Sequence, residues 1–285
     1  MYPSRKEIRA VNLRDSIKKN GFVFNKRFGQ NFISDTNLLD AIAYDAGINS
    51  EDTVVEIGTG GGTLTLALAK KAKKVVSFEI DKNLQPVLAD TLAGAENIEV
   101  VFRDFMKVSE EEIREFAGGD YKVVANLPYY ITTPVIMRLA EKNMSSSITV
   151  MVQKEVAERL AAKVGSKDYG AITAQLNLTS SVEITRNVNR NMFFPPPNVD
   201  SAVVKITFDK EKQSLDYSMV RRLIKVAFAM RRKTLINNLV SAGINKEKGL
   251  SAISKLGFSP DIRGEKLSSE DFVNLEKEFY GEIDS

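Results

Sequence analysis

Runs of aliphatic and β-branched residues alternate, from residue 53 to residue 162, with segments whose apolar positions recur every three or four residues. The runs are short and contain few polar interruptions. Lys122–Ala125, for example, reads Lys-Val-Val-Ala, which is typical of a strand buried on both faces. Strand and helix in regular alternation predict right-handed βαβ units, and therefore an α/β domain whose mostly parallel sheet is covered by helices on both faces.

The pattern also locates these elements. Strands are expected at Thr53–Ile57, Lys74–Glu79, Ile98–Phe102, Lys122–Ala125 and Ser147–Gln153. Helices are expected to follow them at Leu64–Lys70, Asn83–Leu92, Ser109–Phe116, Pro134–Lys142 and Glu155–Ala162. Before the first strand, helices are expected at Ser4–Lys19 and Asp35–Ala46, with an irregular stretch at Gly21–Ile33 between them.

The pattern changes after residue 162. Strands are expected at Ala171–Ser181 and Ala202–Phe208, separated by Phe193–Asn198, whose consecutive prolines predict a rigid extended loop. Asp209–Leu215 is polar and indicates a linker. Only helical patterns follow, at Tyr217–Met230, Lys233–Ala242, Lys246–Leu256 and Ser269–Phe279. We therefore predict two domains, residues 1–207 and residues 208–285, the second of them smaller and all-helical.

The composition excludes several kinds of chemistry. The 285 residues include neither cysteine nor histidine, which removes disulfides, thiolate nucleophiles, Cys/His zinc sites and His-based catalytic triads. No apolar stretch approaches the roughly 18 residues of a membrane span, and the first thirty residues lack the apolar core of a secretory signal. Any catalysis must use carboxylates, amides, hydroxyls, lysines, backbone groups or a cofactor.

The net charge is only +3, but the basic residues are unevenly distributed. Residues 1–30 contain eight lysines and arginines against two acidic residues, and residues 221–238 contain six lysines and arginines and no acidic residue. Two such patches on a nearly neutral chain indicate a polyanionic partner. Either patch alone is also explained by a solvated helix face.

A glycine-rich loop, Glu56-Ile-Gly-Thr-Gly-Gly-Gly62, follows the first strand of the alternating region and opens the next helix. Glycines there allow positive φ and let the backbone approach a ligand closely. The next strand ends at Glu79, whose carboxylate can accept both hydroxyls of a ribose. The third strand ends at Asp104 and Phe105, which can bind an adenine amino group and cover the ring. A glycine loop and two acids at successive strand ends resemble the Rossmann-like class I S-adenosylmethionine methyltransferases.

Each of these residues also has a purely structural interpretation. Gly58, Gly60 and Gly62 are compatible with a tight turn that binds nothing. Glu79 and Asp104 are compatible with helix caps. The presence of both acids at consecutive strand ends favours the cofactor site.

The fourth strand ends in Asn126-Leu127-Pro128-Tyr129, which looks like the Asn/Asp-Pro-Pro-Tyr/Phe motif of methyltransferases that modify exocyclic amines. Adenine N6 is a poor nucleophile because its lone pair is conjugated with the ring. The Asn126 side-chain oxygen and the Leu127 carbonyl can accept both amino hydrogens and favour a pyramidal nitrogen. Pro128 stiffens this turn, and Tyr129 can stack on an extruded base. The alternative is a turn in which Asn126 caps a helix and Tyr129 lies in the core.

Six segments occur in order along nearly the whole chain: Lys26–Phe32, Glu56–Gly60, Asn126–Pro134, Gln153–Leu160, Phe193–Ser201 and Phe228–Leu239. Together they resemble the KsgA/RsmA family of small-subunit ribosomal RNA adenine dimethyltransferases. The resemblance implies S-adenosylmethionine as methyl donor. It also implies N6,N6-dimethylation of two adjacent adenosines in the 3′-terminal hairpin of 16S rRNA, within an immature small subunit.

The resemblance also implies roles for single residues. Asn31 and Ile33 should touch the methionine end of the cofactor or close over it, although Asn31 is also compatible with a simple turn. Phe193 should oppose Tyr129 across the target base, although it is also compatible with packing against the Pro-rich loop. The expected cofactor-binding residues are Asn31, Ile33, Gly58, Gly60, Glu79, Ile80, Asp104, Phe105 and Asn126. The expected target-base residues are Asn126, Leu127, Pro128, Tyr129 and Phe193.

The segment Arg221–Leu239 is expected to be a basic helix that binds RNA. Arg231, Arg232 and Lys233 are consecutive, so they fan over more than half of the helix circumference and cannot all lie on one face. We expect most of the basic residues to contact phosphates, and the alternatives are a solvated face and internal pairing with acids. These residues are Arg221, Arg222, Arg231, Arg232 and Lys233.

Two other functions remain open at this point. One is that of an Erm-type 23S rRNA adenine methyltransferase, against which the Arg231–Leu235 segment and the Phe-x-Pro-x-Pro loop argue. The other is that of a non-enzymatic ribosome assembly factor, against which the intact Glu79, Asp104 and Asn126 argue. We expect a cytoplasmic monomer with neither a metal nor a membrane partner.

Overall fold

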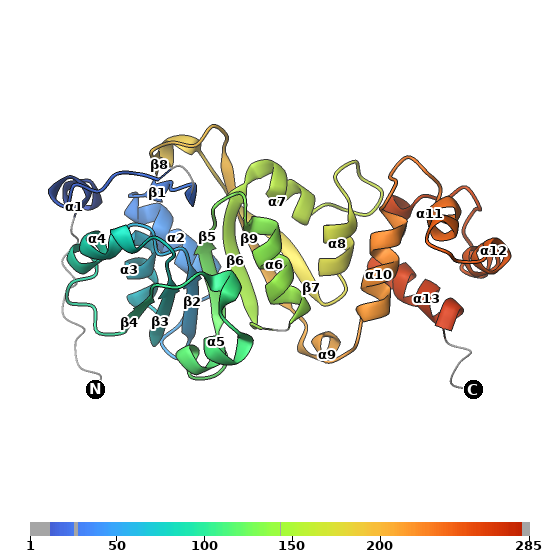
Figure 1. Ribbon diagram of the computed structural model, residues 1–285, viewed down its shortest axis with the longest axis horizontal. Helices are drawn as coiled ribbons and strands as arrows, with labels where there is room; N and C mark the ends of the chain where they lie inside the picture. The colour runs from blue at the N-terminus through green and yellow to red at the C-terminus, as the bar shows by residue number, and fades with distance from the viewer. Residues whose placement is uncertain (1–11, 26–27, 143, 281–285) are drawn as a thin grey trace. The chain divides into compact units, whose positions relative to one another are not determined.

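The computed structural model describes residues 12–25, 28–142 and 144–280, which form two compact units (Figure 1). The first unit contains the described residues through Ala157 together with Glu183–Thr207. The second contains Glu158–Val182 together with the described residues from Phe208 onward. Lys26, Arg27 and most of the helix expected from Ser4 lie outside the described residues, and the described part of that helix is α1 (Leu13–Lys19).

A seven-stranded sheet forms the centre of the first unit, with strand order β4-β3-β2-β5-β6-β9-β7. Its neighbours from β4 to β6 run parallel, and β9 runs antiparallel to β6. The strands are β2 (Thr53–Ile57), β3 (Lys74–Phe78), β4 (Ile98–Val101), β5 (Lys122–Asn126), β6 (Ser147–Gln153), β7 (Ser180–Val188) and β9 (Ser201–Phe208). This is the mostly parallel sheet that the alternating pattern predicts.

Helices alternate with the parallel strands, each within a few residues of its predicted position. They are α2 (Thr36–Asp45), α3 (Thr63–Ala69), α4 (Gln85–Thr91), α5 (Glu110–Ala117), α6 (Thr132–Glu141) and α7 (Lys154–Leu160). The short 3-10 turns are η2 (Lys82–Leu84) and η3 (Phe105–Lys107). Local sequence fixes their starts: Asp35 caps α2 by accepting from Leu38 N at 2.9 Å, and Ser109 and Glu112 form a reciprocal capping box at α5.

The register of the central strands positions the site. Consecutive valines of β2 and β5 are fully buried, and Val55 pairs with Val123 across the two strands. Ile57 at the end of β2 pairs with Phe78 at the end of β3. Because these strands are parallel, the loops that follow them all leave from the same edge of the sheet, which is where open α/β sheets bind ligands.

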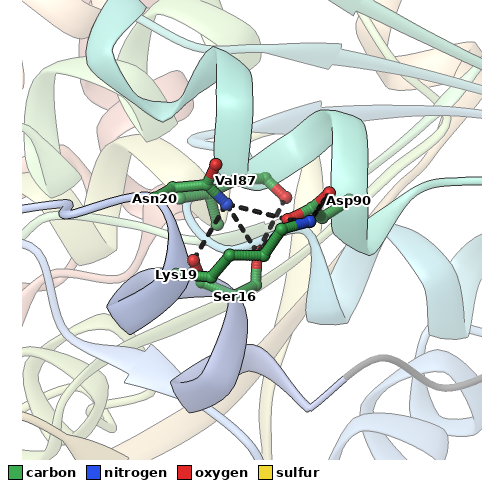
Figure 2. Close-up of polar contacts among 5 residues, drawn as sticks. All are labelled: Ser16, Lys19, Asn20, Val87 and Asp90. Carbon is green, nitrogen blue, oxygen red and sulfur yellow. Dashed lines mark hydrogen bonds and ion pairs between the residues drawn. The ribbon is translucent and has the colours of Figure 1, made fainter.

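The N-terminal segment is attached to the first unit through α1. Asp90 of α4 accepts hydrogen bonds from Lys19 Nζ at 2.9 Å and from Asn20 Nδ2 at 2.8 Å, and Ser16 Oγ lies 3.3 Å from the same carboxylate (Figure 2). Ser16 Oγ also reaches the Val87 carbonyl at 3.5 Å. These contacts, between residues far apart in the sequence, hold the start of the segment on α4.

The same segment is attached a second time at its other end. In β1 (Phe32–Ile33), Phe32 pairs with Phe194 and Ile33 with Phe193 of the antiparallel strand β8 (Phe193–Phe194). Gly21–Ile33, expected to be irregular, therefore ends in a two-residue ladder. No local pattern indicates this ladder, because its partner strand lies in the Pro-rich loop, far along the chain. The ladder connects that loop to the N-terminal segment.

The second unit is helical apart from the start of β7. Its helices are α8 (Ala171–Leu176), α9 (Lys210–Gln213), α10 (Ser218–Ala227), α11 (Leu235–Ser241), α12 (Lys246–Lys255) and α13 (Ser269–Tyr280). Their core is built around Tyr169, Ile224, Leu239 and Phe272, all buried. Across the described ranges, no helix is long and apolar enough to cross a membrane.

The strand expected at Ala171–Ser181 is wrong. Residues Ala171–Leu176 form α8, and the strand begins only at Ser180 and continues to Val188. Ala174 and Leu178 pack into the helical core of the second unit. The sequence of this segment does not distinguish helix from strand, so the tertiary contact determines that it forms a helix. β7 lies at the sheet edge with many polar, partly exposed residues, so it lacks the apolar run of a central strand.

Two further expectations differ from the structure. Residues 158–182, assigned by the sequence to the first domain, pack with the second unit, because Tyr169 and Ala174 belong to its core. The basic segment Arg221–Leu239 is not one continuous helix: α10 ends at Ala227 and α11 begins at Leu235, which agrees better with the separate helical patterns at Tyr217–Met230 and Lys233–Ala242. Asn238 stabilises the break, since its Nδ2 donates to the Ala227 carbonyl at 2.8 Å at the end of α10.

Candidate active site

A cavity of about 390 Å³ lies in the first unit, beyond the carboxyl ends of β2, β3 and β5. Its walls come from the loops that follow these strands and β4, and from residues 28–33 of the N-terminal segment. All the residues that the sequence predicts for the cofactor and the target base line this one cavity: Asn31, Ile33, Gly58, Gly60, Glu79, Ile80, Asp104, Phe105, Asn126, Leu127, Pro128, Tyr129 and Phe193.

The glycine loop adopts a backbone conformation that residues other than glycine rarely adopt. Gly58, Gly60 and Gly62 have φ angles of 84°, 54° and 79°. A Cβ at Gly60 would also lie only 3.1 Å from the Phe32 ring. The loop therefore lies directly against the N-terminal segment, and it presents backbone rather than side chains to the cavity.

Glu79 closes this glycine loop. Its Oε2 accepts from Gly60 N at 2.9 Å, and its Oε1 accepts from Ile80 N and Asp81 N, each at 2.8 Å. Burial raises the pKa of the carboxyl, and the three N–H donors act in the opposite direction. A carboxylate offers about four lone-pair sites, so one acceptor position remains for a ligand hydroxyl. Glu79 is therefore both a structural tie and an available acceptor.

Asp104 and Phe105 form the adjoining wall. Asp104 is the N-cap of η3, since its Oδ1 accepts from Met106 N at 3.0 Å, so the capping interpretation of this residue is correct in part. Phe105 packs edge-on against Phe78, with ring centroids 5.5 Å apart. Arg138 of α6 lies over the Phe105 ring, 5.2 Å from its centroid, and donates to the Phe105 carbonyl at 2.5 Å. The wall is thus fixed both by the Asp104 cap and by Arg138.

Asn126 connects the central strands to the N-terminal segment. Its Nδ2 donates to the Asn31 carbonyl at 2.9 Å, and the Asn31 side chain donates to the Gly29 carbonyl at 3.2 Å. Because the amide nitrogen is engaged, the side-chain oxygen is left as the acceptor of Asn126. Asn126 and Leu127 both line the cavity, and the pairing of their oxygens with an amino group stays a prediction.

Tyr129 and Phe193 differ in how far they are exposed to the cavity. Tyr129 is half-buried, and its hydroxyl lies 2.9 Å from Ser201 Oγ. Phe193 is 5% exposed and packs in the apolar core beside Ile33. Both line the cavity, whereas the placement of a base between them stays a prediction.

Glu56 is a cavity residue whose role the sequence did not indicate. Its side chain is fully buried, and its Oε2 accepts from Thr65 Oγ1 and from Ser77 Oγ, each at 2.6 Å. Its Oε1 has no hydrogen-bond partner among the described residues. Burial raises the pKa of Glu56 to about 8, so the carboxyl is mostly neutral at pH 7.

Three further residues fix the site without having been predicted from the sequence. Gln30 donates from Nε2 to Asp81 Oδ2 at 2.7 Å, Arg138 holds the Phe105 wall, and Ser201 contacts Tyr129. Gln30 and Ser201 lie inside the segments that carry the family resemblance, so a signal for them existed. No local sequence pattern indicates the role of Arg138, because its contact is with a loop 33 residues earlier in the chain.

The basic residues expected to bind RNA lie in the second unit and serve more than one purpose. Arg231 donates from Nη2 to the carbonyls of Lys167 and Tyr169, at 2.8 and 3.0 Å, and so ties the turn between α10 and α11 to the loop before α8. Arg221 reaches the Gln175 carbonyl at 3.5 Å. The remaining candidates are exposed: Arg222 on α10, and Arg232 and Lys233 in the turn.

Comparisons with known proteins agree over nearly the whole chain. A model of the ribosomal RNA adenine dimethylase family matches residues 21–280. The ribosomal RNA small subunit methyltransferase A of Bacillus licheniformis is 43% identical over 275 residues, covering 93% of this chain and 94% of the relative. The protein of the same name from Caldanaerobacter subterraneus is 44% identical over 259 residues, covering 90% and 97%.

Two solved structures have a similar fold. A dimethyladenosine transferase from Plasmodium falciparum superposes with a TM-score of 0.76 at 30% identity, over 88% of this chain and 98% of that one. The 23S rRNA methyltransferase ErmE superposes with a TM-score of 0.69 at 26% identity, over 87% and 99%. The predicted class I methyltransferase fold with a helical C-terminal part is confirmed.

The raised pKa of Glu56 predicts a specific pH dependence of stability. A carboxyl whose pKa is higher in the folded state contributes stability that is fully present below its ordinary pKa of 4.5 and is lost as the pH rises through about 8. In Glu56→Gln this contribution is absent, because glutamine keeps an acceptor oxygen for Thr65 and Ser77 but does not titrate. Unfolding temperatures measured from pH 4.5 to 9 should therefore fall more steeply in the parent protein than in Glu56→Gln. Glu79 is present in both proteins, and because its charge contributes to the raised pKa of Glu56, the comparison reports Glu56 together with this coupling. Parallel curves would contradict the assignment.

Proposed function

Because the chain belongs to the ribosomal RNA adenine dimethylase family, we propose that it transfers methyl groups from S-adenosylmethionine to N6 of two adjacent adenosines in the 3′-terminal hairpin of 16S rRNA. The observation that carries the proposal is the convergence of three features on one cavity: a glycine loop, two strand-end acids and the Asn126–Tyr129 turn. The relatives of 43–44% identity are named as small-subunit methyltransferases, which favours this substrate over large-subunit RNA.

The cavity fits S-adenosylmethionine in size and in donor set. Its volume of about 390 Å³ lies within the roughly 300–1,000 Å³ range of small-molecule sites. The free acceptor position of Glu79 suits a ribose hydroxyl, and Asp104 with Phe105 suits an adenine amino group and ring. Asn31, Ile33 and the glycine loop enclose the remaining part of the cavity, where the methionine end would lie. The bound cofactor supplies an electrophilic methyl group attached to sulfur.

The protein's own contribution to the transfer is positioning. The Asn126 oxygen and the Leu127 carbonyl accept the two amino hydrogens of adenine, which favours a pyramidal nitrogen whose lone pair is directed at the methyl carbon. Stacking on Tyr129 holds the ring plane in that orientation. With the donor bound, the new N–C bond would form as the C–S bond breaks, and the proton released from nitrogen would pass to solvent. Since no strong base is needed, the lack of histidine is no obstacle.

In the second unit, we propose that exposed basic residues bind RNA phosphates. Arg222, Arg232 and Lys233 are exposed and so are available for such contacts. Arg231 is partly committed to the Lys167 and Tyr169 carbonyls, so its removal would also loosen the turn that presents Arg232 and Lys233.

The function is tested by methyl transfer to ribosomal particles. The full chain is incubated with labelled S-adenosylmethionine and, in parallel, with under-methylated small subunits, fully methylated small subunits and large subunits, and the modified bases are mapped. We expect label only in the under-methylated small subunits, as dimethyladenosine at two adjacent positions. Label in large-subunit RNA would support an Erm-type enzyme, and no label anywhere would support a non-enzymatic assembly factor.

Replacement of Asp104 should weaken cofactor binding. Asp104→Asn keeps an oxygen that caps η3 but puts an amide donor where the adenine amino group needs an acceptor. We expect S-adenosylmethionine affinity, measured by calorimetry, to fall roughly 10- to 100-fold, as for loss of a charge-assisted hydrogen bond. The unfolding temperature of the free protein should stay close to the parent value. Unchanged affinity would remove Asp104 from the cofactor site.

Replacement of Asn126 should slow the chemical step more than it weakens RNA binding. The contact with N6 strengthens as the amine pyramidalises, so Asn126→Ala should lower the single-turnover rate roughly 10²- to 10³-fold, by analogy with the loss of an oxyanion-hole donor. Asn126→Asp retains an acceptor but loses the bond to Asn31, so it should retain more activity than the alanine variant. The rate is measured with both substrates saturating. Transfer by Asn126→Ala at the parent rate would make Asn126 a structural turn residue only.

Removal of Arg232 and Lys233 together should weaken binding of small subunits and flatten its salt dependence. The log–log slope of affinity against salt concentration should fall by roughly one unit for each phosphate that is no longer bound. Lys210→Ala combined with Lys212→Ala removes the same charge from the exposed helix α9 and serves as the control. An equal decrease in the control, or an unchanged slope in the turn variant, would mean that the turn between α10 and α11 is not a phosphate-binding site.

A further inference from the structure

The target-base tyrosine is held by a residue that lies much later in the chain. The Tyr129 hydroxyl lies 2.9 Å from Ser201 Oγ, and either oxygen can be the donor. Burial raises the pKa of the Tyr129 phenol, so it is protonated at neutral pH and able to donate. The hydroxyl is at the far end of the ring from the backbone, so this bond opposes rotation about the Cα–Cβ bond, which would carry the hydroxyl furthest from Ser201.

Ser201 is itself fixed in the sheet. It is fully buried and is the first residue of β9, where it pairs with Gln153 at the end of β6. β6 in turn pairs with β5, whose last residue Asn126 lies opposite Met151. The hydrogen bond therefore joins two points that the same sheet already holds in register: the turn after β5 and the start of β9.

The segment before Ser201 is also constrained. Asp200 accepts from Arg190 N at 3.0 Å through its side chain and from Lys154 N at 3.0 Å through its carbonyl. These bonds close the loop that contains the Pro-rich segment and β8. The Ser201 hydroxyl is thus a fixed reference point, whereas the half-buried Tyr129 ring, on a turn at the cavity, is the part that could otherwise rotate.

We propose that Ser201 is a positioning residue for methyl transfer: its hydroxyl holds the Tyr129 ring in the side-chain rotamer that places the ring beside the target adenine. The inference rests on the proposed function, in which Tyr129 is the stacking residue. Without the bond the side chain samples other rotamers about Cα–Cβ, and the amine is less often aligned with the methyl carbon. Misalignment of this kind lowers the rate of transfer while leaving the phosphate contacts and the cofactor contacts in place.

The test is a double-mutant cycle on the complete chain with under-methylated small subunits. Ser201→Ala and Tyr129→Phe each remove the hydrogen bond from one side while keeping the ring. Each should lower the single-turnover rate at saturating substrates by roughly 10-fold, with unchanged affinities for S-adenosylmethionine and for the subunit. The double variant should be no slower than the slower single variant, since both substitutions remove the same bond.

Ser147→Ala is the matched control. Ser147 is a buried serine at the opposite end of the same strand pair, where it lies across from Thr207, so its loss perturbs the β6–β9 pair without touching the cavity. It should methylate at the parent rate.

If Ser201→Ala lowers the unfolding temperature but transfers methyl groups at the parent rate, or if the two losses multiply in the double variant, the positioning role is wrong while the proposed function stands. Should Ser201→Ala fail to fold, Tyr129→Phe alone decides, because a parent-level rate in that variant contradicts the role. An inactive parent protein would overturn the proposed function and this inference together.

Discussion

The parallel register of β2, β3, β4 and β5 is the constraint on which the cavity depends. It brings the ends of four strands to one edge of the sheet, so that the glycine loop, Glu79, Asp104 and Asn126 become neighbours although they are distant in sequence. The strands that carry these loops lie at the centre of the sheet, where the valines of β2 and β5 are buried on both faces. A slip by one residue would turn every side chain to the opposite face and separate these groups.

The strands supply only part of the cavity, and the N-terminal segment completes it. Asp90 anchors the start of that segment on α4, and the β1–β8 ladder anchors its end beside Phe193. Between the anchors, the Asn31 carbonyl engages the amide nitrogen of Asn126. The segment therefore lines the cavity and at the same time engages the amide nitrogen of Asn126.

The sequence pattern predicts those helices and strands whose formation depends on neighbouring residues in the chain. It predicts β2 and β6 to the residue because their apolar runs have sharp ends, and it predicts Gly58, Glu79, Asp104 and Asn126 because they follow the ends of strands. The family resemblance, and not the pattern, indicated Asn31, Ile33 and Phe193. The pattern does not predict α8, whose sequence is neutral until the helix packs against the helical core. The β1–β8 ladder and the Arg138 contact pair residues far apart in the chain, and no window of sequence contains both partners.

The proposed function requires that one cavity hold the donor at its Glu79 and Asp104 side and present the target base at its Asn126 and Tyr129 side. A crystal structure of the protein with S-adenosylhomocysteine tests this requirement most directly. We predict a ribose hydroxyl at the Glu79 carboxylate, the adenine amino group at Asp104, and the sulfur directed toward Asn126. A ligand bound elsewhere, or bound in this cavity with its adenine at the Asn126–Tyr129 turn, would contradict the assignment.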